Sequence, residues 1–219
     1  MAVERLGRIV DVVEHAADTR SLFLVADDGE PLAFRAGQFL SCLVPIGGDL
    51  LTRPYSIASA PGEPRLELLL NLDPGGPGSH RLFQLRVGDT LRFTGPWGTF
   101  TIDDPPAVET VFVAEQTGIA PIRSILLDLV RRPQRPPLRL LYGTTLAIYR
   151  DELAALPGLT LDIVAPERVF DEAAHRYVEV DRDRTRHIFI CGVGAPVLAL
   201  RDRLRAAGYP RRAVQYERW

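Results

Sequence analysis

The sequence predicts a two-domain protein, in which an antiparallel β-barrel of Greek-key type is followed by an α/β domain built on a parallel sheet. Short β-branched and aromatic runs, separated by turn residues, fill residues 5–104. Beyond them, apolar strand-like runs alternate with helical patterns. Between the two patterns stands Asp103-Asp104-Pro105-Pro106, whose prolines interrupt regular structure. We therefore expect domains at residues 1–104 and 107–219.

Composition narrows the class of protein. The 219 residues carry a net charge of −2, which gives no reason to expect binding to nucleic acid or to a membrane surface. No apolar run approaches the roughly 18 residues that a membrane-spanning helix needs. The stretch Met1-Ala2-Val3-Glu4-Arg5 lacks the pattern of a secretory signal. Cys42 and Cys191 are too few for a disulfide framework or a four-thiolate iron–sulfur cluster, and the histidines lack metal-ligand spacing. A reduced, cytoplasmic setting and no metal site are expected.

The elements of the first domain follow from these runs. Strands are expected at residues 9–13, 21–25, 38–44, 65–71 and 90–94. A further strand-like stretch, Arg53-Pro54-Tyr55-Ser56, combines a guanidinium suited to phosphate, a phenol suited to stacking and a small hydroxyl. Period-two alternation places Arg53 and Tyr55 on one face and Ser56 on the other, and Pro54 belongs at a strand start, edge or bulge. This set suits a flat, anionic cofactor such as a flavin nucleotide, and it also fits an ordinary edge strand.

A glycine-rich loop interrupts the strands at residues 75–83 and opens a short helix near Ser79. Free N–H groups at a helix start, with glycines that let a ligand approach the backbone, form an anion site. The same sequence also fits a hairpin loop capped by Ser79.

The second domain alternates strands and helices. Strands are expected at residues 111–114, 139–142, 160–164, 187–191 and 213–216, and helices at residues 121–131, 148–156 and 197–207. Ligands of such sheets lie at the carboxyl ends of the strands. The arginines of residues 182–186 alternate with acids and are interpreted as a solvated face.

The stretch Arg-Pro-Tyr-Ser-Ile-Ala-Ser at residues 53–59 resembles the flavin-binding motif of the ferredoxin–NADP reductase family, and further family-like motifs cover nearly the whole chain. The resemblance implies FAD as cofactor, partly through Ser59. It implies that Arg53 holds the FAD pyrophosphate, Tyr55 stacks on the isoalloxazine and Ser56 lies near flavin N5. The other flavin-binding residues expected on this basis are Pro54, Leu70, Gly76, Gly78 and Ser79.

Two segments of the second domain resemble the family's nicotinamide-nucleotide site. Residues 117–121, Thr-Gly-Ile-Ala-Pro, resemble its nucleotide loop, which implies coenzyme contacts at Thr117, Gly118 and Pro121. Cys191-Gly192 resembles the segment whose Cys lies near the nicotinamide, so both residues are expected to bind coenzyme and Cys191 to assist catalysis.

The last residues also resemble the family. Trp219 corresponds to a terminal aromatic that covers the flavin in some members, and Glu217 to a carboxylate implicated in proton handling. With Ser56 and Cys191, Glu217 completes the expected catalytic set. A frayed chain end is the alternative for Trp219.

The resemblance implies an enzyme that passes electrons from NADH or NADPH through FAD to a ferredoxin-like or iron–sulfur protein, or to another subunit. Ala165-Pro166-Glu167-Arg168 follows the third strand of the second domain, where NADPH-using relatives carry Ser-Arg. Glu167 suits a ribose hydroxyl pair and so favours NADH, whereas Arg168 and Arg150 are candidate phosphate partners.

One departure supports a rival function. Glu115 and Gln116 stand where the family has glycines or small residues, so that a carboxylate would repel a dinucleotide and Gln116 would crowd it. The alternative is a flavin-binding electron-transfer or sensory subunit that no longer uses a pyridine nucleotide.

Overall fold

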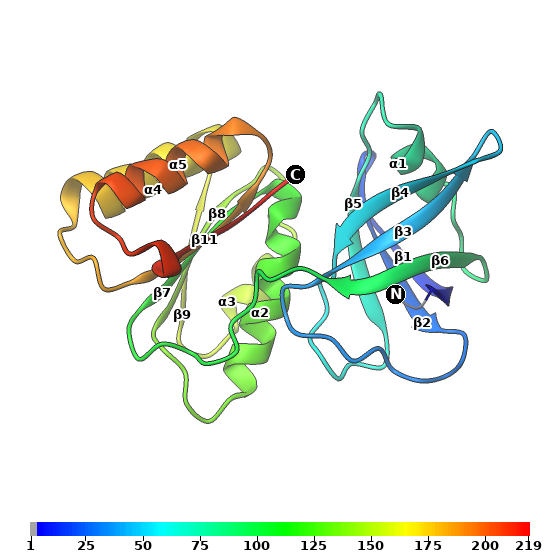
Figure 1. Ribbon diagram of the computed structural model, residues 1–219, viewed down its shortest axis with the longest axis horizontal. Helices are drawn as coiled ribbons and strands as arrows, with labels where there is room; N and C mark the ends of the chain where they lie inside the picture. The colour runs from blue at the N-terminus through cyan, green and yellow to red at the C-terminus, as the bar shows by residue number, and fades with distance from the viewer. Residues whose placement is uncertain (1–3) are drawn as a thin grey trace. The chain divides into compact units, whose positions relative to one another are not determined.

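The computed structural model describes residues 4–219 and divides the chain into two compact units, residues 1–101 and 102–219 (Figure 1). Residues 1–3, at the start of the predicted first domain and of the stretch examined for a secretory signal, lie outside the described part. Within residues 4–219, no helix has the length and apolar character needed to span a bilayer.

The first unit is an antiparallel sheet of six strands in the order β4-β3-β6-β1-β2-β5. Its elements are β1 (Glu4–Ala16), β2 (Thr19–Ala26), β3 (Phe39–Ile46), β4 (Asp49–Ser56), β5 (Leu66–Asn71), α1 (Pro77–Leu82) and β6 (Thr90–Trp97). A bridge between Ile57 and Leu68 joins the two ends of this order, so the sheet closes into the predicted barrel.

The barrel is filled by side chains that alternate inward along each strand, including the fully buried Leu22, Leu40 and Phe93. Cys42 belongs to the same core, where burial raises the pKa of its thiol to about 12. Pro54 lies on β4 at one end of the strand order, the edge position predicted from its missing N–H.

The second unit is a parallel sheet in the order β11-β10-β7-β8-β9, as the alternating pattern predicts. Its strands are β7 (Thr110–Glu115), β8 (Leu138–Gly143), β9 (Leu159–Val164), β10 (His187–Gly192) and β11 (Val214–Arg218), and its helices include α2 (Ile119–Arg131), α3 (Arg150–Ala154) and α5 (Ala195–Ala206). The chain starts on the central strand β7, adds β8 and β9 on one side, and then returns to add β10 and β11 on the other. The order therefore reverses between β7 and β10.

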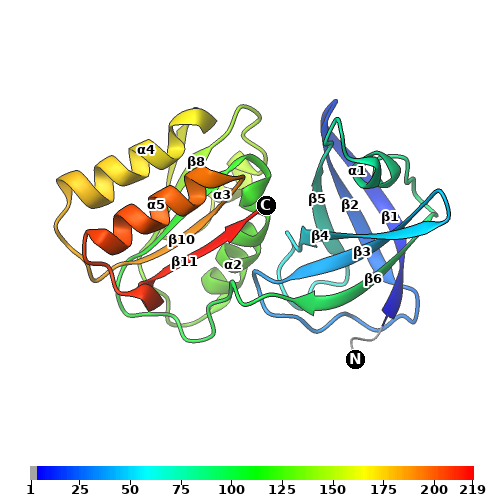
Figure 2. The ribbon, with the colours of Figure 1, turned by 45° about the horizontal axis from the view of Figure 1, so that its top comes forward.

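Helices cover both faces of this sheet, with α4 (Val169–Ala174) and α5 on one face and α2 on the other (Figures 1 and 2). Residues from α4 and α5 pack with alternate residues of β7 and β10 in one buried cluster. The sequence analysis missed α4 and the π-helical turn that follows it at His175–Val180. Its apolar stripe, at residues 169, 170, 173, 174 and 177, has helical spacing and would have revealed the element.

The interpretation of residues 182–186 as a solvated face was wrong for two of the arginines. Arg184 donates to the carbonyls of Val178 and Ala207, at 3.2 and 2.9 Å, and so closes the end of the missed helical segment. Arg186 pairs with Glu109 and, at 2.9 Å, with Asp181. The alternation with acids reflects ion pairing within the unit rather than hydration.

Candidate functional site

Arg53 and the glycine-rich loop lie together in the first unit. A Cβ added to Gly78 would lie 3.0 Å from Cγ and 3.1 Å from Nε of Arg53, so the side chain of Arg53 packs directly on the Gly78 backbone. The guanidinium donates to the Thr52 carbonyl at 3.0 Å, and among the described residues it has no carboxylate partner. Its remaining donors point to a ligand that supplies the anion.

The short helix of this loop begins earlier than predicted. The N-cap is Gly76, without a side-chain cap, and Pro77 occupies the first turn of α1. The predicted cap, Ser79, lies inside the helix and is buried, where its hydroxyl donates to the Gly76 carbonyl at 2.8 Å and accepts from the Asp73 N–H at 3.1 Å. Ser79 therefore folds the loop back on itself, and the backbone of the first turn faces Arg53.

Tyr55 and Ser56 follow Arg53 along β4. Arg53 and Tyr55 are half-buried while Thr52 and Pro54 are exposed, which confirms that the first two share a face. Burial raises the pKa of Tyr55 to about 12, so its phenol stays neutral at physiological pH. Ser56 is 6% exposed, and its Oγ has no hydrogen-bond partner among the described residues. A buried hydroxyl without a partner is costly unless a ligand satisfies it.

Two other expected flavin residues serve the fold with their side chains. Leu70 is fully buried in the barrel core, backbone included, so its side chain and backbone are both enclosed by the barrel. The Ser59 hydroxyl accepts from the Glu67 N–H at 3.1 Å. The Ser59 side chain is thus engaged within the barrel.

The residues around Arg53 fit FAD on three structural grounds. Within residues 4–219, the guanidinium of Arg53 has no carboxylate partner and the buried Ser56 hydroxyl has no hydrogen-bond partner, and the absent Cβ of Gly78 leaves room for the Arg53 side chain. A pyrophosphate and a hydrogen-bonding ring system satisfy these groups together.

In the second unit, the strand order reverses between β7 and β10, and open α/β sheets bind their ligands outside the carboxyl ends of the strands at such a reversal. The region at these two strand ends is the candidate coenzyme crevice. Thr117 and Gly118 lie in the 3₁₀ turn that follows β7, and Pro121 lies in the first turn of α2. A Cβ on Gly118 would come within 2.5 Å of the Cys191 carbonyl oxygen. Gly118 is therefore required for close approach of the two strand ends.

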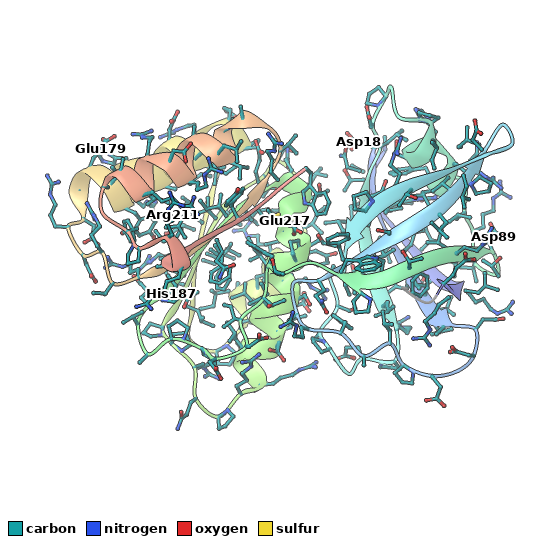
Figure 3. All side chains as sticks on the ribbon, viewed as in Figure 1. Asp18, Asp89, Glu179, His187, Arg211 and Glu217 are labelled. Carbon is teal, nitrogen blue, oxygen red and sulfur yellow. The ribbon has the colours of Figure 1, made fainter. Side chains whose placement is uncertain are left out.

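Cys191 and Gly192 end β10, and Glu217 is paired with Cys191 in the register of the neighbouring strand β11. Figure 3 labels Glu217 on this last strand. Burial raises the pKa of the Cys191 thiol well above its usual value, and the nearby carboxylates of Glu217 and Glu115 add to this effect. Cys191 is therefore a neutral thiol at physiological pH.

Trp219 is not frayed. Its N–H donates to the Gly192 carbonyl and its own carbonyl accepts from the Gly194 N–H, both at 3.1 Å. The side chain is 38% exposed. The last residue of the chain is thus held against the loop that follows β10.

The sequence analysis missed two residues of this crevice. Val193 donates its backbone N–H to a carboxylate oxygen of Glu115 at 3.0 Å. Phe170, on the missed helix α4, packs so close to Gly192 that an added Cβ would meet its Cζ at 2.7 Å. Only the helical stripe around Phe170 carried a signal in the sequence. Residues 4–219 contain no cluster of three metal-ligating side chains, and the histidines are dispersed.

Comparison with known proteins agrees with this arrangement. Residues 7–102 match the family of oxidoreductase FAD-binding domains. The chain is 35% identical to ferredoxin–NADP reductase B of Sorangium cellulosum over 97% of this chain and 96% of that protein. It is 31% identical, over 63% of its length, to the reductase component of phenol 2-monooxygenase from Pseudomonas sp., of which it spans only 38%.

Among solved structures, the fold is similar to that of a ferredoxin–NADP⁺ reductase from Neisseria gonorrhoeae with bound FAD and NADP, with a TM-score of 0.82 and 22% identity. That similarity covers 100% of this chain and 99% of the other. The fold, the match to FAD-binding domains and the sequence identity over nearly the full length of both chains all indicate the same family. The chain belongs to the ferredoxin–NADP reductase family and is a flavoprotein oxidoreductase that passes electrons from a reduced nicotinamide coenzyme through FAD.

Proposed function

We propose that this enzyme oxidises NADH in preference to NADPH and delivers the electrons to a separate ferredoxin-like or other iron–sulfur protein. The flavin supplies the chemistry of accepting a hydride and releasing single electrons. The residues of the chain bind the two cofactors, orient them and hold protons.

In the first unit, Arg53 holds the FAD pyrophosphate together with the backbone of Gly76, Gly78 and Ser79. The packing of Arg53 on Gly78 supports this assignment, because it brings the guanidinium to the first turn of α1. Tyr55 offers the flat surface for the isoalloxazine, and Ser56 offers a hydroxyl at flavin N5. Pro54 completes the set of contacts, whereas the fully buried Leu70 belongs to the barrel core.

In the second unit, Thr117, Gly118 and Pro121 line the coenzyme crevice, and Cys191 and Gly192 receive the nicotinamide. As a neutral thiol, Cys191 positions the ring without adding a negative charge beside it. Glu217, on the neighbouring strand β11, relays a proton. The covering of the flavin by Trp219 stays a prediction from the family resemblance alone.

The proposal of an external acceptor is supported by the relatives. The 219 residues hold two cysteines, both free and buried, on different units. Two cysteines do not suffice for a four-thiolate cluster. Relatives are named as the reductase component of phenol 2-monooxygenase and the electron transfer component of toluate 1,2-dioxygenase, which fits delivery of electrons to a partner protein.

The observation that favours NADH is the exposed carboxylate of Glu167 in the turn after β9. Glu167 is exposed in the turn Pro166–Arg168. The Nη2 atom of Arg168 lies 4.0 Å from Oε2 of Glu172. Arg176 forms ion pairs with Asp162, at 2.6 Å between Nη1 and Oδ2, and with Glu172. The basic residues nearest this turn are therefore partly neutralised, and an additional phosphate on the ribose would meet the carboxylate of Glu167.

Anaerobic stopped-flow absorbance tests the proposal. FAD-loaded protein is mixed with NADH or NADPH, and we expect faster bleaching of the flavin band by NADH. Faster reduction by NADPH would overturn the coenzyme preference. Bound flavin that neither coenzyme bleaches would favour the rival function, a flavin subunit that does not use pyridine nucleotides.

Glu167→Gln is expected to raise kcat/KM for NADPH by about fivefold while changing that for NADH by less than about twofold, because it removes one like charge in a solvated setting. Steady-state kinetics with a dye acceptor measures both values. Asp202→Asn, which removes an exposed carboxylate on α5, is the matched control and should change neither. An unchanged NADPH value in Glu167→Gln would show that this turn does not face the ribose.

Ser56→Ala is expected to keep the stability of the protein within about 0.5 kcal/mol, because the lost hydroxyl makes no hydrogen bond to residues 4–219, and to slow flavin reduction about tenfold or more. Thermal unfolding and single-turnover reduction measure the two effects. Ser56→Thr retains the hydroxyl and should recover part of the rate. Equal reduction rates for the wild type and Ser56→Ala would remove Ser56 from the site.

A further inference from the structure

A side chain of the protein itself crosses the coenzyme crevice. Glu115 is the last residue of β7, and its carboxylate accepts the backbone N–H of Val193, in the loop after β10, at 3.0 Å. The same side chain packs on Gly192, where an added Cβ would lie 2.9 Å from its Oε2. This contact spans the two strands between which the strand order reverses.

The side chain of Gln116 is directed away from β10 and towards β8. Its Oε1 accepts the hydroxyl of Thr144, after β8, at 3.3 Å. Its φ of 49° lies in the left-handed region, which costs a non-glycine residue roughly 1 kcal/mol or more. The crowding expected at Gln116 is thus directed towards β8, and Glu115 alone is placed at the crevice between β7 and β10.

The electrostatics of the crevice make the Glu115 contact relevant to coenzyme binding. Backbone N–H groups in loops at the carboxyl ends of parallel strands are the donors that bind pyrophosphate. Glu115 presents an anion to one of them, and Glu217 adds a second carboxylate near Cys191. A dinucleotide entering this space meets a donor already engaged and a charge of its own sign.

We propose that Glu115 is a built-in competitor of the coenzyme pyrophosphate: it takes the Val193 N–H in the free enzyme and must release it when the coenzyme binds. The inference rests on the proposed use of a pyridine nucleotide in the second unit. Glu115 thereby lowers coenzyme affinity and favours release of the oxidised product after each turnover.

Two substitutions separate the charge from the contact. Glu115→Gln removes the charge and keeps an oxygen that accepts from Val193. Glu115→Ala removes both. We expect the dissociation constant for NAD⁺ to fall about threefold or more in Glu115→Gln and about tenfold or more in Glu115→Ala. Asp202→Asn controls for the loss of a carboxylate elsewhere on the unit.

Isothermal titration of NAD⁺, and in parallel NADP⁺, into the FAD-loaded protein measures affinity without turnover. The amide resonance of Val193 provides an independent readout: it should shift in Glu115→Ala, and it should shift in the wild type when coenzyme is added.

The outcomes distinguish the inference from the proposed function. Tighter binding in both variants, with the larger gain in Glu115→Ala, supports the competitor. Binding of coenzyme to the wild type with equal or weaker binding in both variants overturns the competitor and leaves the reductase function standing. Absence of coenzyme binding in the wild type and in both Glu115 variants overturns the proposed use of pyridine nucleotides and the competitor with it. Binding in the two variants but not in the wild type supports the competitor in its strongest form.

Discussion

Replacing Arg53 with alanine is expected to lower the affinity of the protein for FAD by roughly 10- to 100-fold, so that the variant is purified with little yellow colour. Hydrogen bonds between a guanidinium and a phosphate are charge-assisted and contribute about 1.5–3 kcal/mol each. Among residues 4–219 the half-buried Arg53 packs on Gly78 and has no carboxylate partner, which supports the proposal that it binds an external anion. Quenching of FAD fluorescence on titration of the apoprotein measures the affinity.

Two further variants make this test specific. Arg53→Lys keeps the charge but loses the planar fork, and its affinity should fall between those of the wild type and Arg53→Ala. Arg92→Ala removes a surface arginine that pairs with Glu4 at 2.5 Å, and it should bind FAD like the wild type. If Arg53→Ala retained wild-type affinity, the pyrophosphate would have to be bound by another part of the barrel.

Gly118→Ala is expected to lower both the stability of the second unit and its affinity for coenzyme. The added Cβ would lie 2.5 Å from the Cys191 carbonyl oxygen and 3.1 Å from the Gly192 nitrogen. Both are backbone atoms, so no side-chain rotation relieves the clash and the ends of β7 and β10 must separate. We expect a loss of about 1–3 kcal/mol in the stability of this unit. We also expect coenzyme affinity to fall by more than about tenfold, because the crevice changes shape.

Calorimetric unfolding and titration of NAD⁺ check the two effects. Gly75→Ala, in the glycine-rich loop of the first unit, controls only for the addition of a methyl group to a glycine, because the nearest atom to its added Cβ is 3.8 Å away, an ordinary contact. The unfolding temperature of the control should stay within about 2 °C of the wild type. A Gly118→Ala variant with wild-type stability and coenzyme binding would contradict the close contact between the two loops.

The architecture of this protein is largely readable from its residue patterns. Period-two runs in the first half and buried apolar runs alternating with helices in the second half correspond to the barrel and the parallel sheet. These patterns are local, because each reflects which face of one strand or helix is buried. The segment at residues 169–180 was not predicted, although its apolar residues recur at helical spacing between charged ones.

Contacts between loops were beyond the reach of the sequence. Glu115 and Val193 are 78 residues apart, and nothing in either stretch indicates that a carboxylate and a backbone N–H meet. The residue types mark Glu115 as unusual for a nucleotide loop, but the direction of its side chain depends on which strands are neighbours. Similarly, the family resemblance implied only a coenzyme contact at Gly118, whereas the space beside Gly118 is occupied by the Cys191 carbonyl. Such details depend on the reversal of strand order, which appears only once the sheet is assembled.

The burial of both cysteines has a practical consequence for chemical labelling. Cys42 and Cys191 are fully enclosed, and burial raises the pKa of each thiol, so neither provides a reactive thiolate at neutral pH. Toward maleimides the folded chain should behave as though it had no cysteine. A single cysteine introduced on an exposed turn would then accept a fluorophore or spin label selectively, without removal of either native thiol.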